Sequence, residues 1–255
     1  MVMSGVLQTY ATALLDLIYP RRCEACESAL DHGRCDEARW LCDDCLRQLP
    51  RLEAPFCEKC GQPYDGAITG SFRCGNCADL KLHFECSISA YRAEKTVREL
   101  IHRFKYQHEL HLSGLLGHLL QKTLHDPRLA AADMSQWTLV PVPLHHARQR
   151  EREYNQAWEL CRALSRHSGI PALDALKRVR PTTPQASLSR HQRIENLHRA
   201  FEVKNSVRSH SRLKGRNILL VDDVLTTGST TSECARVLRK KAGVGRVVVI
   251  TVARG

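Results

Sequence analysis

Two adjacent carboxylates, Asp222 and Asp223, are followed closely by a run in which four of five residues carry a hydroxyl group, Thr226-Thr227-Gly228-Ser229-Thr230. We call residues 226–230 the hydroxyl loop. Side-chain hydroxyls and backbone N–H groups at the start of a helix form a binding site for a phosphate. Paired carboxylates accept hydrogen bonds from the two hydroxyls of a ribose. The run therefore predicts a site for a sugar that carries a phosphate on one side and a diol on the other.

The segments around this run predict a strand, a loop, a helix and a second strand. Residues 218–221 are four branched apolar residues, which favour a buried strand. Residues 231–241 are expected to form a helix capped by Ser229 or Thr230, and Gly243 and Gly245 end it before an apolar strand at 247–252. Open α/β sheets bind ligands at the carboxyl ends of their strands. An ordinary strand–helix–strand turn with solvated acids is the alternative.

Residues 218–230 resemble the phosphoribosyl pyrophosphate (PRPP) signature of type I phosphoribosyltransferases, and every position of that pattern is filled. The glycine patterns of Walker loops and dinucleotide-binding fingerprints are absent here. The resemblance implies that Mg²⁺-PRPP binds through one continuous set of residues. This set is Asp222, Asp223, Val224, Leu225, Thr226, Thr227, Gly228, Ser229 and Thr230.

Eight of the 12 cysteines form four Cys-x-x-Cys pairs. The first cluster is Cys23, Cys26, Cys42 and Cys45, and the second cluster is Cys57, Cys60, Cys74 and Cys77. Two such pairs complete a tetrahedral thiolate site, the closed arrangement of structural zinc. The spacing predicts two zinc ribbons in series, each held together by its metal because so short a segment buries little core.

Three other uses of these cysteines are weighed against zinc. Disulfides require an oxidising compartment, for which the N-terminus shows no export signal. A thioredoxin-like site requires one Cys-x-x-Cys in a strand–helix–strand context, and iron–sulfur clusters use other spacings. Cys35 lies inside the first loop and is an alternative ligand there.

Two arginine-rich segments follow the predicted strand at residues 138–142. Arg148 and Arg152 come just after this strand, where guanidinium groups suit a pyrophosphate. Residues 178–201 are polar and are expected to form a flap over the same crevice, with Arg190, Arg193 and Arg199 available to nucleic acid. The alternatives are an exposed basic helix start and a solvated basic hairpin.

The charge distribution divides the chain into two modules. Residues 1–90 hold 9 Lys/Arg and 13 Asp/Glu, a net of −4, whereas residues 91–255 hold 29 and 14, a net of +15. We expect an N-terminal helix and double zinc ribbon at 1–85 and a second domain at 86–255 that attracts an anionic partner. The apolar face within residues 6–19 suits a docking helix better than a membrane anchor, and a cytoplasmic protein without membrane insertion is expected.

With these parts in order, nearly the whole chain resembles the ComF family, which joins a double zinc ribbon to a phosphoribosyltransferase domain. The matching segments are residues 20–23, 104–106, 140–143, 152–156 and 185–201. At Glu153 the family's pattern has glycine, so this chain carries an extra negative charge beside the presumed pyrophosphate. The resemblance implies an α/β phosphoribosyltransferase fold with a central parallel sheet flanked by helices. It also implies a cytoplasmic role in natural competence, with single-stranded DNA and other DNA-processing proteins as partners.

Two classes of function follow from these expectations. The first is a phosphoribosyltransferase in which Asp222, Asp223, Arg148 and Arg152 act on Mg²⁺-PRPP and an acceptor that the sequence does not name. The second is a non-catalytic, PRPP-responsive factor that binds single-stranded DNA, or a regulator on a retained transferase scaffold. Glycosyl transfer separates the first class from the others.

Overall fold

A computed structural model of the chain describes residues 20–31, 34–68, 70–78, 82–145, 150–180, 200–205 and 213–255. The chain divides into two compact units, residues 1–49 and 50–255. The first cluster belongs to the first unit, and the second cluster belongs to the second unit with the rest of the chain. The expected helix within residues 6–19, Arg148, and Arg190, Arg193 and Arg199 of the flap lie outside the described residues.

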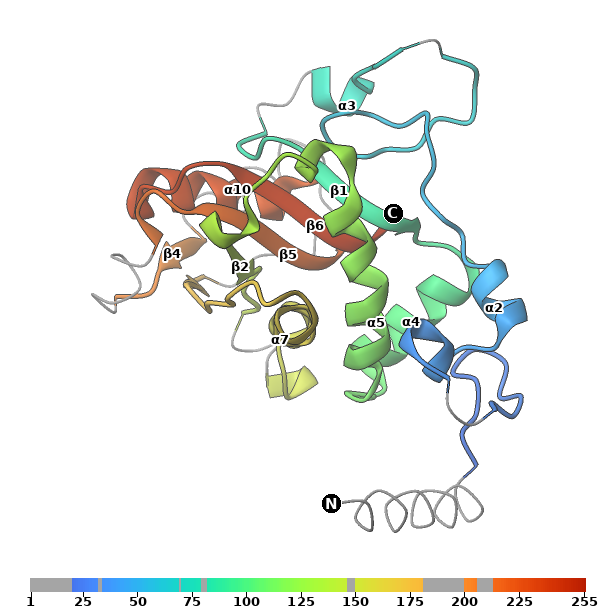
Figure 1. The fold of residues 1–255 in the computed structure, drawn as a ribbon. Coiled ribbons are helices and arrows are strands. Elements are labelled where there is room, and N and C mark those ends of the chain that lie inside the picture. Colours follow the sequence, from blue (N-terminus) through green and yellow to red (C-terminus); the bar gives the residue numbers. More distant parts are fainter. Residues whose placement is uncertain are drawn as a thin grey trace. The chain divides into compact units, whose positions relative to one another are not determined.

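A sheet of four parallel strands forms the centre of the second unit (Figure 1). Its order is β1 (Ser87–Arg92), β6 (Val247–Arg254), β5 (Asn217–Leu225) and β2 (Trp137–Pro141). Every residue of β6 and of β2 is buried, as expected for strands covered on both faces. The predicted α/β fold with a central parallel sheet is confirmed.

Strand β5 is longer than the sequence predicts and runs through both acids. Its pairing with β6 continues from Ile218↔Val247 through Asp222↔Thr251 to Leu225↔Arg254. The expected end at residue 221 is therefore wrong, because backbone pairing with a neighbouring strand holds the polar residues in extended conformation. Since side chains alternate along a strand, the two adjacent carboxylates leave opposite faces of the sheet.

Helices cover both faces of this sheet (Figure 1). Helix α5 (Leu112–Gln121) contacts β1 and β6, and helix α7 (Gln156–Ser168) contacts β2 and β5 on the same face. Helix α4 (Lys95–Tyr106) follows β1 and packs against α5, while α10 (Ser229–Val237) lies on the opposite face. The described residues of the second unit also contain the short helices α3 (Gly75–Ala78), η2 (Lys122–His125), η3 (Pro127–Leu129), η4 (Met134–Gln136) and the π-turn η6 (Leu238–Ala242).

The start of α10 differs from the expected cap. Its N-cap is Gly228, with φ of 75°, and no side chain caps the helix there. Neither Ser229 nor Thr230 is the cap, because the chain enters the helix through a left-handed turn that glycine adopts without strain. The hydroxyls of residues 229 and 230 are thereby placed within the first turn of the helix.

A small antiparallel pair brackets the expected flap. Strand β3 (Leu176–Arg178) pairs with β4 (Phe201–Val203), with Arg178 opposite Phe201. The predicted insertion at 178–201 thus starts and ends at neighbouring points, and its residues 181–199 are not among those described.

The first unit contains short elements around its cysteines. These are η1 (Asp36–Arg39), α2 (Asp43–Arg47) and an isolated bridge between Arg22 and Ala29. Across the described part of the chain, no helix has both the length and the apolar character that crossing a bilayer requires.

Candidate ligand pocket and cysteine clusters

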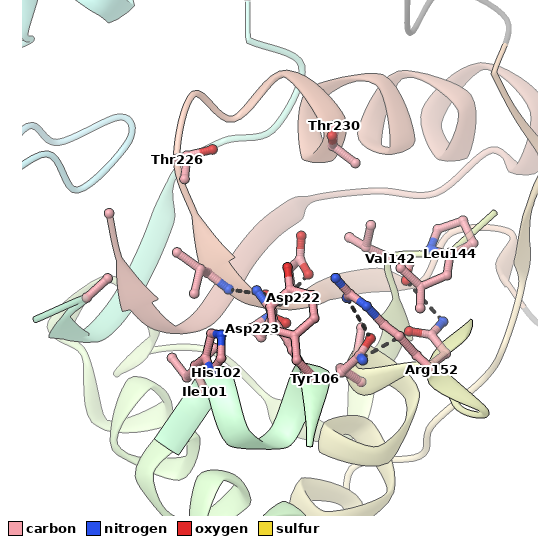
Figure 2. A pocket seen from close by; sticks show the side chains of 18 of the residues that line it. Ile101, His102, Tyr106, Val142, Leu144, Arg152, Asp222, Asp223, Thr226 and Thr230 are labelled. Atoms are coloured by element: carbon pink, nitrogen blue, oxygen red, sulfur yellow. Dashed lines mark hydrogen bonds and ion pairs between the residues drawn. The ribbon is translucent and has the colours of Figure 1, made fainter. Parts of the chain in front are cut away.

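A cavity of about 460 Å³ opens at the carboxyl ends of the four parallel strands (Figure 2). Ala93 follows β1, Gly255 follows β6, and Val142 follows β2 around its rim. Of the residues predicted to bind PRPP, Asp222, Asp223, Val224, Thr226 and Thr230 line this cavity, whereas Leu225, Thr227, Gly228 and Ser229 do not. Four cationic side chains also line it, namely Arg98, Lys105, Arg152 and Arg178. The cavity therefore combines carboxylates, hydroxyls and an excess of positive charge.

Asp223 is anchored by the protein itself. Its carboxylate is buried, and its Oδ1 lies 2.8 Å from Nζ of Lys105 on α4. The same oxygen accepts a hydrogen bond of 2.7 Å from the backbone N–H of Val224. With these partners Asp223 fixes the end of β5 against α4, and it is held in position before any ligand arrives.

The carboxyl group of Asp222 has a raised pKa. Burial, and next the charge of Asp223, raise the pKa of Asp222 to about 7, although Lys105 and Arg152 act to lower it. Its Oδ1 accepts a hydrogen bond of 3.0 Å from the backbone N–H of Asp223. The two adjacent acids are therefore not equivalent: Asp223 is held by the ammonium group of Lys105, whereas the pKa of Asp222 is raised to about 7.

The hydroxyl loop is ordered by its own hydroxyls and by an aromatic neighbour. Thr227 Oγ1 and Ser229 Oγ lie 3.0 Å apart, and Thr231 Oγ1 donates to the carbonyl of Gly228 at 3.0 Å. A Cβ at Gly228 would lie 3.4 Å from the ring of Phe84. Glycine is favoured at this position because of its positive φ of 75°, and the ring of Phe84 lies next to it.

Arg152 is a buried cation at the wall of the cavity. Its Nη1 donates to Gln156 Oε1 at 3.3 Å, and its guanidinium carbon lies 4.7 Å from the centre of the Tyr106 ring. Arg152 Nε and Gln156 Nε2 are buried without hydrogen-bond partners. Buried donors normally find an acceptor. These two orphaned donors fit a site that is completed by an anionic ligand.

The segment that carries Arg152 is held between β2 and α7. Asn155 caps α7 by accepting from Ala157 N at 3.1 Å, and its Nδ2 donates to the carbonyl of Val142 at 3.1 Å. Glu153 has a φ of 65°, a left-handed conformation that glycine adopts more easily. Its carboxylate is exposed and lies 3.8 Å from Nδ1 of His108, and Glu153 does not line the cavity.

Both cysteine clusters have the geometry of a tetrathiolate metal site. In each, the four Sγ atoms lie within 4.8 Å of one another. The distance from Cys26 Sγ to Cys42 Sγ is 3.6 Å, as is that from Cys60 Sγ to Cys74 Sγ. Tetrahedral zinc with bonds of about 2.3 Å places sulfurs ~3.8 Å apart. The backbone N–H groups of Cys42 and Cys74 donate to Cys23 and Cys57 Sγ at 3.3 Å in each case.

Hydrogen bonds favour thiolate formation at Cys26 and Cys42 of the first cluster and at Cys57 of the second cluster. Hydrogen bonds from Ser28 lower the pKa of Cys26 to about 6. Burial acts to raise the pKa of Cys57, but backbone N–H groups of Cys74, Cys60 and Lys59 lower it to about 7. The donor set in both clusters fits structural zinc, as predicted. Cys35 is exposed and is not a member of the first cluster.

Comparisons with known proteins agree with these features. The double zinc ribbon domain family matches residues 14–78. Competence protein F of Haemophilus influenzae is 34% identical over 215 residues, which cover 84% of this chain and 90% of that protein. The chain belongs to the ComF family.

Other relatives match over a comparable share of the chain at lower identity. DNA utilization protein YhgH of Escherichia coli K12 is 31% identical over 87% of this chain and 92% of that protein. Competence protein ComFC of Bacillus subtilis is 25% identical over 84% of each. Among solved structures, the allosteric regulatory enzyme of purine biosynthesis shares 17% identity with a TM-score of 0.36, covering 57% of this chain and 26% of that one. A likeness at that level adds nothing to the fold described above.

Several residues of the cavity were not predicted from the sequence as site residues. They are Arg98, His102, Lys105, Tyr106, Asn155, Gln156 and Arg178. The segments 104–106 and 152–156 match the ComF pattern, and this match was the available signal for Lys105, Tyr106, Asn155 and Gln156. Lys105 is the most important of them, because its ion pair with Asp223 joins residues far apart in the chain.

Proposed function

We propose that this ComF family member binds Mg²⁺-PRPP in the cavity at the carboxyl end of the sheet and acts there as a phosphoribosyltransferase-like protein. The observation that carries the proposal is the convergence of Asp222, Asp223, Thr226 and Thr230 on one cavity lined by four cationic residues. The signature resemblance supports the same ligand. The acids of β5 suit the ribose hydroxyls, and the first turn of α10 suits the 5′-phosphate.

The residues of this cavity have separate roles in the proposal. Asp222, as a carboxylate, accepts hydrogen bonds from the ribose diol, while Asp223 holds β5 in place through Lys105. Backbone N–H groups and hydroxyls of residues 226–230 receive the 5′-phosphate. Arg152, together with Arg148, neutralises the pyrophosphate. When bound, Mg²⁺ supplies further neutralisation of the leaving pyrophosphate. The protein contributes positioning and fixed charge in the transfer step.

Calorimetric titration of the zinc-loaded chain with Mg²⁺-PRPP tests the binding. Hydrogen bonds to charged groups contribute about 1.5–3 kcal/mol each. Asp222→Asn is therefore expected to weaken binding by about ten- to a hundredfold. Glu151→Gln, an exposed change outside the cavity, is the matched control and leaves affinity unchanged. An Asp222→Asn variant that binds as the parent does would place the ligand elsewhere.

A second proposed role is binding of single-stranded DNA without strong sequence preference. Relatives are named for competence and for DNA utilization, and residues 91–255 carry a net charge of +15. Phosphate neutralisation releases counterions, so affinity falls steeply with salt. Incoming DNA in the cytoplasm, handled with other competence proteins, fits this chemistry.

The salt dependence of oligonucleotide binding tests this role. Replacing Arg190, Arg193 and Arg199 together with alanine is expected to weaken binding and flatten the salt slope by up to ~0.7 for each lost phosphate contact. Zinc content serves as the control, and it is expected to stay at the parent value. Equal affinity and equal slope in the triple variant would remove the flap from the DNA surface.

Catalysis and ligand sensing are separated by pyrophosphate release. Incubation with Mg²⁺-PRPP and candidate nucleobases, amines or oligonucleotides releases pyrophosphate if transfer occurs. PRPP binding without release from any acceptor favours the non-catalytic, PRPP-responsive factor.

A further inference from the structure

The last strand of the sheet ends in a buried arginine that contacts both the second cluster and the strand before the hydroxyl loop. Arg254 is 3% exposed. Its Nε donates to the carbonyl of Cys60 at 2.9 Å, and its Nη2 approaches Cys60 Sγ at 3.7 Å. Its Nη1 donates at 2.9 Å to the carbonyl of Leu225, the last residue of β5. One guanidinium therefore connects a metal-ligating cysteine to the residue that precedes Thr226.

Further hydrogen bonds hold the side chain of Arg254 beside the second cluster. Its other acceptors are Gln62 Oε1 at 2.6 Å and an oxygen of Gly255. A buried cation without a counter-charge is costly. Zinc with four thiolates is net negative, because the thiolates outnumber the charges of the ion. The metal-bound second cluster would therefore place negative charge beside the buried guanidinium, which lies 3.7 Å from Cys60 Sγ.

A separate set of contacts joins the same two regions. Phe84, which follows the second cluster, packs against Gly228 of the hydroxyl loop. The backbone N–H of His83 donates to Ser232 Oγ, in the first turn of α10, at 3.0 Å. Cys57, Cys60, Cys77 and Phe84 also share one apolar core with β5, β6 and α10. The second cluster is therefore connected to the hydroxyl loop by two sets of contacts. Arg254 binds the carbonyl of Leu225, just before Thr226, and Phe84 lies next to Gly228.

We propose that the metal-bound second cluster positions the hydroxyl loop and that Arg254 is the positioning residue that transmits its effect. Loss of metal from the second cluster loosens residues 222–232 and lowers the affinity of the cavity for its phosphorylated ligand. Loss of metal from the first cluster has no such effect. The statement on affinity rests on the proposed function, whereas the statement on loop order does not.

Hydrogen–deuterium exchange of the full-length, ligand-free chain tests the loop order, with zinc content measured on the same samples. Cys60→Ser is expected to lose one zinc ion. The backbone amide hydrogens of residues 222–232 are expected to exchange at least about tenfold faster in this variant, because the segment opens more easily. Cys45→Ser is the matched control, expected to lose one zinc without changing exchange in these residues. Unchanged exchange in Cys60→Ser, or equal acceleration in Cys45→Ser, overturns the proposal.

Arg254→Met keeps every cysteine and removes only the hydrogen bonds by which Arg254 joins Cys60 to Leu225. It is expected to retain both zinc ions as purified, to release zinc faster to a chelator, and to accelerate exchange in residues 222–232. Arg254→Lys keeps the charge with fewer donors and is expected to fall between Arg254→Met and the parent. If Arg254→Met leaves amide exchange in residues 222–232 and the rate of zinc release at the parent values, Arg254 does not couple the second cluster to the hydroxyl loop.

Calorimetry with Mg²⁺-PRPP on the same variants adds the functional readout. Affinity is expected to fall about tenfold in Arg254→Met and to stay unchanged in Cys45→Ser. A parent chain that does not bind PRPP contradicts the proposed function, and the exchange comparison still decides whether the second cluster orders the loop.

Discussion

The two cysteine clusters have the same ligands and nearly the same geometry, but the protein uses them differently. The first lies in a unit whose described elements are two short helical segments and one bridge, with Cys26 exposed. The second has three buried cysteines and shares an apolar core with the parallel sheet. The second cluster is therefore part of the apolar core of the parallel sheet, whereas the first cluster lies among short elements of its own unit.

Removing one ligand from each cluster gives the largest expected difference. Cys77→Ser is expected to lower the free energy of unfolding of residues 50–255 by about 3 kcal/mol or more, which corresponds to roughly 10 °C in Tm for a domain of this size. Cys45→Ser is expected to unfold residues 20–49 locally, because metal binding supplies most of their folding free energy. Calorimetry and exchange mass spectrometry on the full chain distinguish the two. Equal loss of global stability in both variants would contradict the claim that only the second cluster stabilises residues 50–255.

The Lys105–Asp223 ion pair tests whether the pocket belongs to the same cooperative unit as the second cluster. Breaking a buried pair by removing one partner costs about 3–5 kcal/mol, and the partial exposure of Lys105 reduces this to about 2 kcal/mol. Asp223→Asn and Lys105→Met are each expected to lower the Tm of residues 50–255, the same unfolding transition that Cys77→Ser is expected to lower.

The double variant Asp223→Asn/Lys105→Met provides the control for that pair. It is expected to recover part of the loss, because neither charge is left unpaired. Strictly additive losses would mean that the two groups do not interact in solution.

Asp222 gives a smaller, pH-dependent effect confined to residues 50–255. Its pKa is raised to about 7, above the ordinary value of 3.8, so the folded state holds a proton that the unfolded state releases. Its contribution to stability is therefore complete below pH ~4 and is lost as pH rises to about 7. Asp222→Asn is expected to gain stability relative to the parent between pH 5 and 7, with no further gain above pH 7. Allowing for partial solvation, we expect about 1–2 kcal/mol, measured by thermal denaturation across pH. A gain that is constant with pH would contradict the raised pKa.

The smallest expected effect is at Glu153, also in the second unit. A non-glycine residue in the left-handed region costs about 1–2 kcal/mol, and glycine's freedom in the unfolded chain offsets part of that. Glu153→Gly is expected to stabilise residues 50–255 by about 0.5–1 kcal/mol and to leave the first cluster's zinc release unchanged. Destabilisation would show that the contact of Glu153 with His108 outweighs the backbone strain.

The sequence predicts the parts of the site that are local. The cysteine pairs, the two acids and the hydroxyl loop are contiguous or closely spaced, so residue type and spacing identify them. The pairing of Lys105 with Asp223 and of Arg254 with Cys60 joins distant segments that only the folded sheet brings together. The extension of β5 through Asp222 was missed because it depends on pairing with β6, not on the polar residues themselves. Arg254 stands next to the last residue in a short Ala-Arg-Gly ending that has no distinctive pattern.

A crystal structure of the zinc-loaded chain with Mg²⁺-PRPP tests the central claim most directly. The account predicts the ribose diol against Asp222 at the end of β5, the 5′-phosphate at residues 226–230, and the pyrophosphate beside Arg152. Arg254 is expected to retain its contacts with Cys60 and Leu225. PRPP bound away from the end of β5, or a cavity left empty at saturating ligand, would contradict it.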